Sequence, residues 1–185
     1  MGFSIAEAAA NLGASVYLIA GPTHLSTTHN FVTTIRVTSA EEMFAEVTKH
    51  YDTCDVAVAA AAVADYKPAA VANQKIKKKD SALVINLEPT QDILAYMGSE
   101  KKQQFLVGFA LETENELENA KGKLKRKNLD LIVLNSLNDT GAGFRTETNK
   151  VTFITADNQI LPQELKPKNE VAEDLLDIIQ KGIHV

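Results

Sequence analysis

Apolar residues recur along the chain with two spacings, and these spacings predict alternating strands and helices. Short apolar or β-branched runs bounded by polar, Gly or Pro residues are typical of buried strands. We expect strands at 15–20, 33–37, 55–64, 83–87, 105–111 and 129–135. The run 55–64 (DVAVAAAAVA) is almost entirely apolar, as in a central parallel strand that is covered on both faces.

Helical periodicity and capping residues predict the helices between these strands. We expect helices at 4–12, 39–50, 90–97, 113–127 and 167–182. Ser39 with Glu42 and Thr113 with Glu116 form capping-box patterns. Thr90 is suited to cap the third helix.

This alternation predicts a three-layer, Rossmann-like α/β fold with a mostly parallel sheet. A β-hairpin is expected near the C-terminus, from 151–154 and 159–161. Residues 67–81 combine Pro68 with several lysines and show no periodicity, which indicates a flexible flap loop. No linker or repeat divides the sequence, so residues 1–185 are expected to form a single domain.

Length and composition place the chain among globular proteins. It has 185 residues, of which 45% are hydrophobic and 23% charged, close to the average for soluble domains. No apolar run approaches the roughly 18 residues that cross a bilayer, and no secretion signal is recognisable. Cys54 is the single cysteine, which excludes an internal disulfide and multi-cysteine metal sites. We therefore expect a cytoplasmic protein that does not bind membranes.

The charge is acidic overall but locally basic. The net charge of −5 argues against general nucleic-acid binding. Two clusters of cations interrupt this acidic background: Lys75, Lys77, Lys78 and Lys79, and Lys121, Lys123, Lys125, Arg126 and Lys127. Such clusters favour a small polyanion as ligand.

In open α/β sheets, ligands bind outside the carboxyl ends of the strands. This rule places Asp65 and the lysine-rich loop on one edge of the predicted sheet. Asp65 is suited to accept hydrogen bonds from ribose hydroxyls or base amines, and Lys75 to meet a triphosphate. From the residues alone, a solvated basic loop and an aspartate that caps a turn are the favoured interpretation. No complete G-x-G-x-x-G or Walker A sequence is present.

Four segments carry a family resemblance: GFSIAEAAANLGASVYLIAGP, AAAVADYKP followed by KIKKK, VGFALET, and KNLDLIVLN. In order and spacing they resemble the bacterial phosphopantothenate–cysteine ligases of coenzyme A biosynthesis. The resemblance covers nearly the whole chain, and the ADY-to-KIKK unit is its most specific part. It implies CTP-driven ligation of 4'-phosphopantothenate with L-cysteine through an acyl-cytidylate. It also implies Mg²⁺ bound with CTP and a homodimer, with FMN only where a decarboxylase domain precedes the chain.

The resemblance also implies the site residues. Lys75 is the expected catalytic lysine that serves the triphosphate. Nucleotide contacts are implied for Ala61, Ala62, Asp65, Lys75, Gln91, Asp92, Ile93, Leu94, Phe109, Lys123 and Lys127. Gln91 stands where the family has proline, and no residue is implied as a metal ligand. Without the resemblance, a place in the apolar core is the favoured interpretation of Phe109, and Lys123 and Lys127 are suited to a solvated helix face.

The start of the chain departs from the family pattern. Members carry an N-x-S-(S/T)-G-K-M-G segment before the first helix, and Met1-Gly2 corresponds to its end. A first strand and that loop are therefore expected upstream of this sequence. Two alternatives remain: a nucleotide-binding or dimerisation module without activity, and a dinucleotide-dependent oxidoreductase, which shares the predicted sheet topology.

Overall fold

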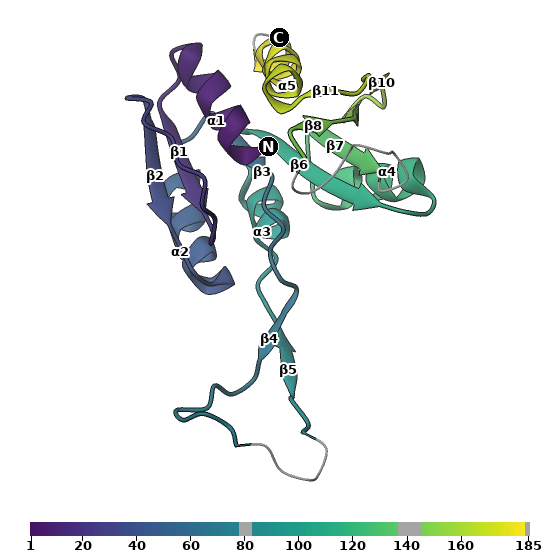
Figure 1. Cartoon of the computed structure of the whole chain (residues 1–185). Coiled ribbons are helices and arrows are strands. Elements are labelled where there is room, and N and C mark those ends of the chain that lie inside the picture. The colour runs from purple at the N-terminus through teal and green to yellow at the C-terminus, as the bar shows by residue number, and fades with distance from the viewer. Residues whose placement is uncertain (78–82, 137–145, 184–185) are drawn as a thin grey trace.

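The computed structural model describes residues 1–77, 83–136 and 146–183, which form an α/β fold (Figure 1). The helices are α1 (Gly2–Asn11), α2 (Ala40–Tyr51), α3 (Ile93–Glu100), α4 (Glu116–Arg126) and α5 (Lys168–Ile183). The strands are β1 (Val16–Ala20), β2 (Val32–Arg36), β3 (Val56–Ala59), β4 (Tyr66–Pro68), β5 (Leu87–Pro89), β6 (Phe105–Glu112), β7 (Leu131–Ser136), β8 (Thr148–Asn149), β9 (Val151–Thr155), β10 (Ile160–Pro162) and β11 (Lys166–Pro167).

The central sheet has five strands in the order β10-β9-β7-β6-β3, and it is mixed. β3, β6 and β7 run parallel, whereas β9 and β10 are antiparallel to their neighbours. The expectation of a mostly parallel sheet is therefore wrong for this sheet. Residues 156–159 alone connect β9 to β10, and so short a return has no room for the helical crossover of a parallel pair. This pair is the predicted C-terminal hairpin, which is confirmed.

The run predicted as one long strand, 55–64, is paired only over β3. Its pairing with β6 ends at Ala59, opposite Gly108. Residues 60–65 leave the sheet and lead into β4. An unbroken apolar run indicates burial, but it does not show where backbone pairing ends.

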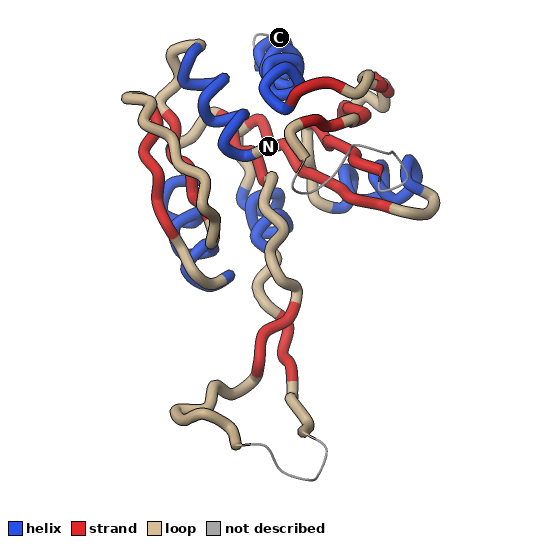
Figure 2. Tube along the Cα trace, viewed as in Figure 1, coloured by secondary structure: helices blue, strands red, loops and turns tan. Residues whose placement is uncertain are grey.

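β4 and β5 pair with each other and begin an arm that projects from the body of the protein (Figure 2). The expected strand at 83–87 is wrong, because the paired residues are 87–89, opposite 66–68. The expected flap loop therefore begins on a short antiparallel ribbon. Residues 78–81 of that loop lie outside the described residues.

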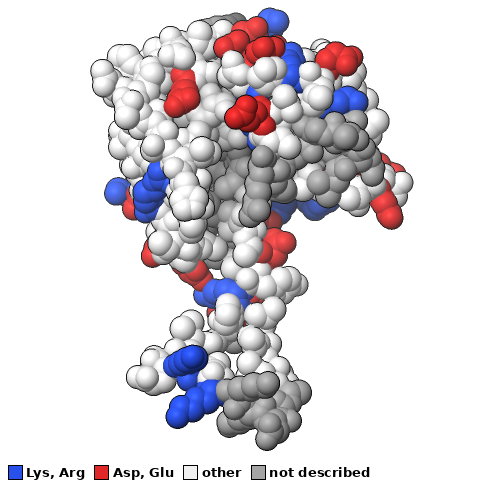
Figure 3. Space-filling model, viewed as in Figure 1, with Lys and Arg blue, Asp and Glu red and all other residues white. Residues whose placement is uncertain are grey.

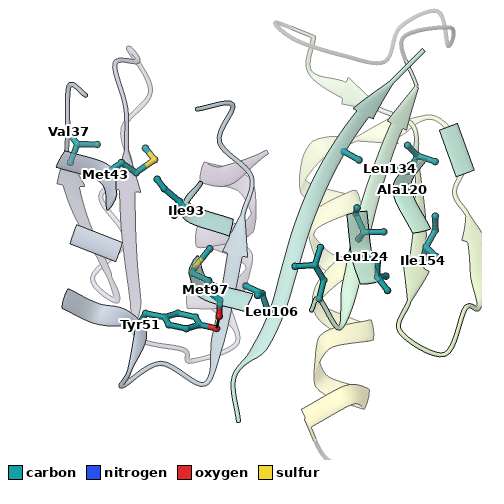
Figure 4. Close-up of a cluster of buried hydrophobic side chains, with 13 residues drawn as sticks. Val37, Met43, Tyr51, Ile93, Met97, Leu106, Ala120, Leu124, Leu134 and Ile154 are labelled. Atoms are coloured by element: carbon teal, nitrogen blue, oxygen red, sulfur yellow. Dashed lines mark hydrogen bonds between the residues drawn. The ribbon is translucent and has the colours of Figure 1, made fainter. Parts of the chain in front are cut away.

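Two hydrophobic clusters fix the layers on either side of the central sheet. One gathers residues of α2, α3 and α4, among them Tyr51, Met97 and Leu124 (Figure 4). The other gathers residues of α1 and α5. β6 contributes to both clusters, since Leu106 faces the first and Val107 the second. The three predicted layers follow from this alternation.

The helix starts show which capping predictions hold. The hydroxyl of Ser39 accepts the Glu42 N–H at 3.1 Å, as expected. The predicted cap at Thr90 is wrong, since Asp92 caps α3 by accepting the Ala95 N–H at 2.8 Å. The predicted start of α4 at Thr113 is also wrong. β6 stays paired as far as Glu112, so α4 begins only at 116.

Two helical glycines give a matched test of the packing between α3 and the end of α4. A Cβ on Gly98 would lie 2.0 Å from the carbonyl oxygen of Lys127, whereas one on Gly122 would lie 3.7 Å from its nearest neighbour, in Arg126. We expect Gly98→Ala to lower the free energy of unfolding in urea by about 1–3 kcal/mol. Gly122→Ala should raise it by about 0.5–1 kcal/mol. Equal stability of the two variants would contradict this packing.

Candidate functional site

Three charged side chains meet between α3 and α4. The Lys127 ammonium forms an ion pair with the Asp92 carboxylate, and Lys123 Nζ donates to the Phe109 carbonyl of β6 at 2.8 Å. The Lys127 side chain is only 17% exposed, but that of Asp92 is 55% exposed. In this ion pair the lysine is thus largely buried, whereas the carboxylate is accessible to solvent.

Burial and mutual charge set the titration of this cluster. Burial lowers the pKa of Lys123. Partial burial of the Asp92 carboxyl opposes its ionisation, but hydrogen bonds from Lys127 and the Ala95 N–H outweigh that cost. The pKa of Asp92 is therefore below its ordinary value. Nearby Lys123 also favours the charged form of Asp92, so the three groups act as one electrostatic unit.

The segment after β3 lies beside the start of α3. The Thr90 N–H donates to the Asp65 carbonyl at 2.9 Å, and the Thr90 hydroxyl donates to the Ala64 carbonyl at 2.6 Å. Ala61, Ala62 and the Asp65 side chain are exposed on this segment. Two segments far apart in the sequence, 61–65 and 90–92, therefore form one continuous border at the carboxyl end of β3.

The other residues that were expected to contact the nucleotide differ in how far their side chains are buried. Gln91 is exposed, whereas the side chain of Ile93 is buried in the hydrophobic cluster of α2, α3 and α4, and Leu94 packs against that cluster. The Phe109 side chain packs with the cluster of α1 and α5. The structure therefore brings the Phe109 carbonyl to the lysines, but it turns the ring to the opposite face of the sheet.

Lys75 is exposed in the loop between β4 and β5, and Figure 1 shows these two strands apart from α4. Lys and Arg surface is visible near the far end of the arm (Figure 3). Of the expected flap lysines, Lys78 and Lys79 lie outside the described residues. Lys75 is therefore not in contact with Asp92, Lys123 and Lys127 in this arrangement.

Sequence reasoning missed Lys67, at the base of the arm. Its ammonium lies 2.5 Å from Glu41 of α2 and 3.2 Å from Glu88 of β5. Hydrogen bonding to Glu41, and then to Glu88, raises the pKa of Lys67. The link joins the arm to the body. No local motif marked it, because its partners come from two distant segments.

Several other expectations concern metals, cysteine chemistry and membranes. Within 1–77, 83–136 and 146–183, no three His, Cys, Asp or Glu residues are grouped to hold a metal ion. Burial raises the pKa of the Cys54 thiol, which lies 3.2 Å from the Tyr51 carbonyl oxygen, so this thiol is a poor nucleophile at neutral pH. None of the helices in those ranges is long and apolar enough to span a bilayer.

Comparison with known proteins gives a consistent family match. Residues 1–183 match the family described as DNA/pantothenate metabolism flavoprotein C-terminal domain. The chain is 42% identical over 179 residues to the coenzyme A biosynthesis bifunctional protein CoaBC of Bacillus subtilis, covering 97% of this chain and 44% of that protein. A crystal structure of the C-terminal domain of a CoaBC protein matches with a TM-score of 0.80 and 40% identity, covering 98% of this chain and 81% of that one.

A further relative carries a different name. The chain is 50% identical over 185 residues to a cysteine/cysteine sulfinic acid decarboxylase of an unknown prokaryotic organism, covering 100% of this chain and 52% of that protein. The chain thus spans about half the length of both curated relatives. The activity in each printed name belongs to the longer protein.

Asp92 offers a test of the cluster that separates its helix cap from its ion pair. Asp92→Asn keeps a side chain that caps α3 but removes the charge that pairs with Lys127, whereas Asp92→Ala removes both. We expect Asp92→Ala to unfold in urea at pH 7 with about 1 kcal/mol less stability than Asp92→Asn. The ion pair, in which the Asp92 carboxylate is largely exposed, should contribute less than the cap. If the two variants were equally stable, Asp92 would not cap α3.

Proposed function

Because the chain belongs to the family of the C-terminal domain of DNA/pantothenate metabolism flavoproteins, we propose that it ligates 4'-phosphopantothenate to L-cysteine at the expense of CTP. The family resemblance expected from the sequence is confirmed by these matches. The proposal assigns the nucleotide to the border formed by 61–65, 90–92 and the lysines of α4.

The cluster of Asp92, Lys123 and Lys127 is the observation that carries this proposal. Two ammonium groups are held in a partly buried place, where their interaction with a phosphate is stronger than in bulk water. The partner of Lys127 is a largely exposed carboxylate. An incoming phosphate can therefore replace Asp92 at Lys127 without breaking the core.

The remaining contacts follow from the same placement. Asp65, exposed beside Thr90, would accept hydrogen bonds from the ribose or base, and backbone groups of Ala61 and Ala62 would face the phosphates. Gln91 would lie at the rim, while Ile93, Leu94 and Phe109 would contribute backbone groups and shape. Lys75 would reach the triphosphate from the arm as a mobile point charge.

The proposed reaction has two balanced steps. The carboxylate of 4'-phosphopantothenate attacks the α-phosphorus of CTP, forming an acyl-cytidylate as the bond to the β-phosphate oxygen breaks and pyrophosphate leaves. The cysteine amine then attacks the acyl carbonyl, the nitrogen releases one proton to solvent as the amide forms, and CMP leaves with the electron pair of the broken C–O bond. The lysines stabilise the charge on the phosphates during both steps.

Mg²⁺ is proposed to arrive bound to the triphosphate. Cations of this kind commonly use one or two carboxylates together with substrate phosphates, and the described residues supply no cluster of three ligands. When bound, the ion would offset phosphate charge. A need for FMN would arise only from a decarboxylase domain outside these residues.

The nucleotide-binding part of the proposal predicts the effect of removing single lysines. We expect Lys123→Ala and Lys127→Ala each to weaken CTP binding, measured by calorimetry, by about tenfold or more, because a hydrogen bond to a charged group contributes about 1.5–3 kcal/mol. Lys75→Ala should weaken it as well, with an unchanged free energy of unfolding, since Lys75 is exposed on the arm. The matched control is Lys125→Ala, an exposed lysine of the same helix, which should bind CTP as the parent does.

Two further readouts of this experiment separate the alternatives. Pyrophosphate release that requires CTP, 4'-phosphopantothenate and cysteine together identifies the ligase, whereas CTP binding without release identifies a binding module. NADH binding, followed by fluorescence, would indicate a dinucleotide-dependent enzyme. If all four lysine variants bound CTP equally, the assignment of the nucleotide to this border would be wrong.

The arm supports the proposal that two copies of the chain associate. Its apolar side chains are between 58% and 84% exposed: Tyr66, Val71, Ile76, Leu83, Val84, Ile85 and Leu87. A two-stranded ribbon is marginally stable alone in water, and contiguous exposed apolar surface is typical of an interaction site. We propose that the arms of a homodimer cover this surface.

This proposal predicts that a charge on the arm shifts the oligomeric state. Val84 is 80% exposed, so Val84→Asp should leave the fold of each chain intact. We expect sedimentation equilibrium to show a shift from dimer to monomer of at least about tenfold in the dissociation constant. Leu25→Asp is the control, since Leu25 is 59% exposed on the loop between β1 and β2. Identical masses for both variants and the parent would contradict an arm-mediated dimer.

A further inference from the structure

The arm is not anchored in the hydrophobic core of its own chain. Val63 packs against the hydrophobic cluster of α2, α3 and α4, and Ile93 is buried in that cluster. Between these two residues, none of the described residues, 64–77 and 83–92, belongs to either hydrophobic cluster. Figure 2 shows the arm projecting from the body over this part of the chain. Hydrophobic packing within the chain therefore does not set the direction of the arm.

Backbone hydrogen bonds join the two sides of the arm at its base. β4 and β5 pair along their whole length, and the Thr90 N–H donates to the Asp65 carbonyl at 2.9 Å on the side next to the body. The two strands therefore change direction together. The segments 61–65 and 90–92 connect this unit to β3 and α3, so any change in the direction of the arm is taken up in these segments.

An ion pair links the base of the arm to the body. The Lys67 ammonium lies 2.5 Å from the Glu41 carboxylate and 3.2 Å from the Glu88 carboxylate. Glu88 is directly opposite Lys67 in the pairing of β4 with β5, so this contact lies within the arm. Glu41 belongs to α2, and its contact with Lys67 spans from the arm to the body. Figure 3 shows Lys and Arg surface beside Asp and Glu surface at this place.

Glu41 is well placed to anchor the arm. It lies in the first turn of α2, where the helix dipole favours a negative charge, and Met43 in the same helix is buried in the core. Hydrogen bonding from Lys67 lowers the pKa of the Glu41 carboxyl, and hydrogen bonding to Glu41 raises the pKa of the Lys67 ammonium. Both groups are therefore charged at neutral pH.

The exposure of this ion pair limits its strength. The side chain of Lys67 is 39% exposed and that of Glu41 is 52% exposed. Ion pairs this exposed are weak and are screened by salt. The pair favours the observed direction of the arm by no more than about fivefold. It therefore biases the direction of the arm and can open readily.

We propose that Lys67 is a positioning residue, whose ion pair with Glu41 holds the arm in the direction in which Lys75 does not contact the lysines of α4. The segments that take up a change in this direction, 61–65 and 90–92, are also the border to which the nucleotide is assigned. The direction of the arm and the occupancy of the border are therefore coupled. The part of this inference that concerns CTP rests on the proposed function, whereas the link between arm and body does not.

The coupling has a definite sign. A triphosphate beside Lys123 and Lys127 attracts the Lys75 ammonium, so CTP binds better to a chain whose arm is free to approach α4. A ligand shifts an equilibrium toward the state that it binds better, and the effect is reciprocal. Opening of the Lys67–Glu41 pair therefore strengthens CTP binding, and CTP binding opens the pair.

Residual dipolar couplings of backbone amides test the link between arm and body without any nucleotide. Glu41→Gln and Glu88→Gln are matched variants, since each removes one carboxylate partner of Lys67 and the same charge. In the parent chain, the couplings of β4 and β5 should fit the same alignment as those of the central sheet. In Glu41→Gln they should become smaller, because the arm then samples several directions. In Glu88→Gln, which keeps the link to α2, they should stay as in the parent.

Calorimetry with CTP tests the coupling. Glu41→Gln should bind CTP more tightly than the parent, by up to about fivefold, because less of the protein is held in the weaker-binding arrangement. Glu88→Gln should bind CTP as the parent does. The gain in Glu41→Gln should disappear when Lys75→Ala is added, since the gain depends on Lys75. A residue that only stabilised the fold would not show this dependence on Lys75.

Three results would overturn the inference. Unchanged couplings in Glu41→Gln would show that other contacts, such as those with a second copy of the chain, set the direction of the arm. Equally reduced couplings in both variants would show that the charge pairs stabilise the strand pairing alone. Smaller couplings in Glu41→Gln with an unchanged CTP affinity would exclude the positioning role. Absence of CTP binding by the parent would contradict the proposed function, whereas the couplings would still decide whether Glu41 holds the arm.

Discussion

β6 is covered on both faces by hydrophobic side chains. Its position determines where α3 lies and where the charged cluster of Asp92, Lys123 and Lys127 forms. Leu106 and Ala110 enter the cluster of α2, α3 and α4, while Val107 and Phe109 enter the cluster of α1 and α5. At Gly108 a Cβ would lie 2.7 Å from Leu129 and 3.1 Å from Leu94. The absence of a side chain at Gly108 lets the side chains of Leu129, just before β7, and of Leu94 in α3 pack this close to the strand.

This close packing brings the charged cluster together. α3 lies against β6 near Leu94, so its capping residue Asp92 is within reach of the lysines of α4. Lys123 reaches across to the Phe109 carbonyl at 2.8 Å. The backbone of β6 thus supplies an acceptor that orients one ammonium group, and the start of α3 supplies a carboxylate for the other. Two cations can be kept partly buried here because each has an oxygen partner.

Most helices and the C-terminal hairpin could be predicted from the sequence, because residues close together in the chain determine them. The Ser39 cap, the amphipathic helices and the C-terminal hairpin depend on residues within a few positions of one another. What the sequence did not show was which strands pair. Residues 83–87 read as a strand by composition, yet Leu87 to Pro89 are paired because Tyr66 to Pro68 lie opposite. The end of β3 and the late start of α4 likewise depend on pairing partners distant in the chain.

In the candidate site, too, local features could be predicted from the sequence, whereas contacts between distant segments could not. Spacing placed Lys123 and Lys127 on one helix face, but their contacts with Phe109 and Asp92 arise from segments 14 and 35 residues away. The family pattern pointed to Phe109 without showing that its ring and its carbonyl face opposite sides of the sheet. Lys67 was overlooked because it joins α2 to β5, and no periodicity reports such a contact.

The most direct test of the central claim is a titration of the isotope-labelled protein with CTP, followed by the chemical shifts of backbone amides. We expect the largest changes in three segments, 61–65, 91–94 and 123–127, together with Ala110, whose N–H follows the Phe109 carbonyl. The amides of the loop at 23–29 should stay unchanged. Changes centred on that loop or on α5, with the three segments unaffected, would contradict a nucleotide site at the carboxyl edge of β3 and β6.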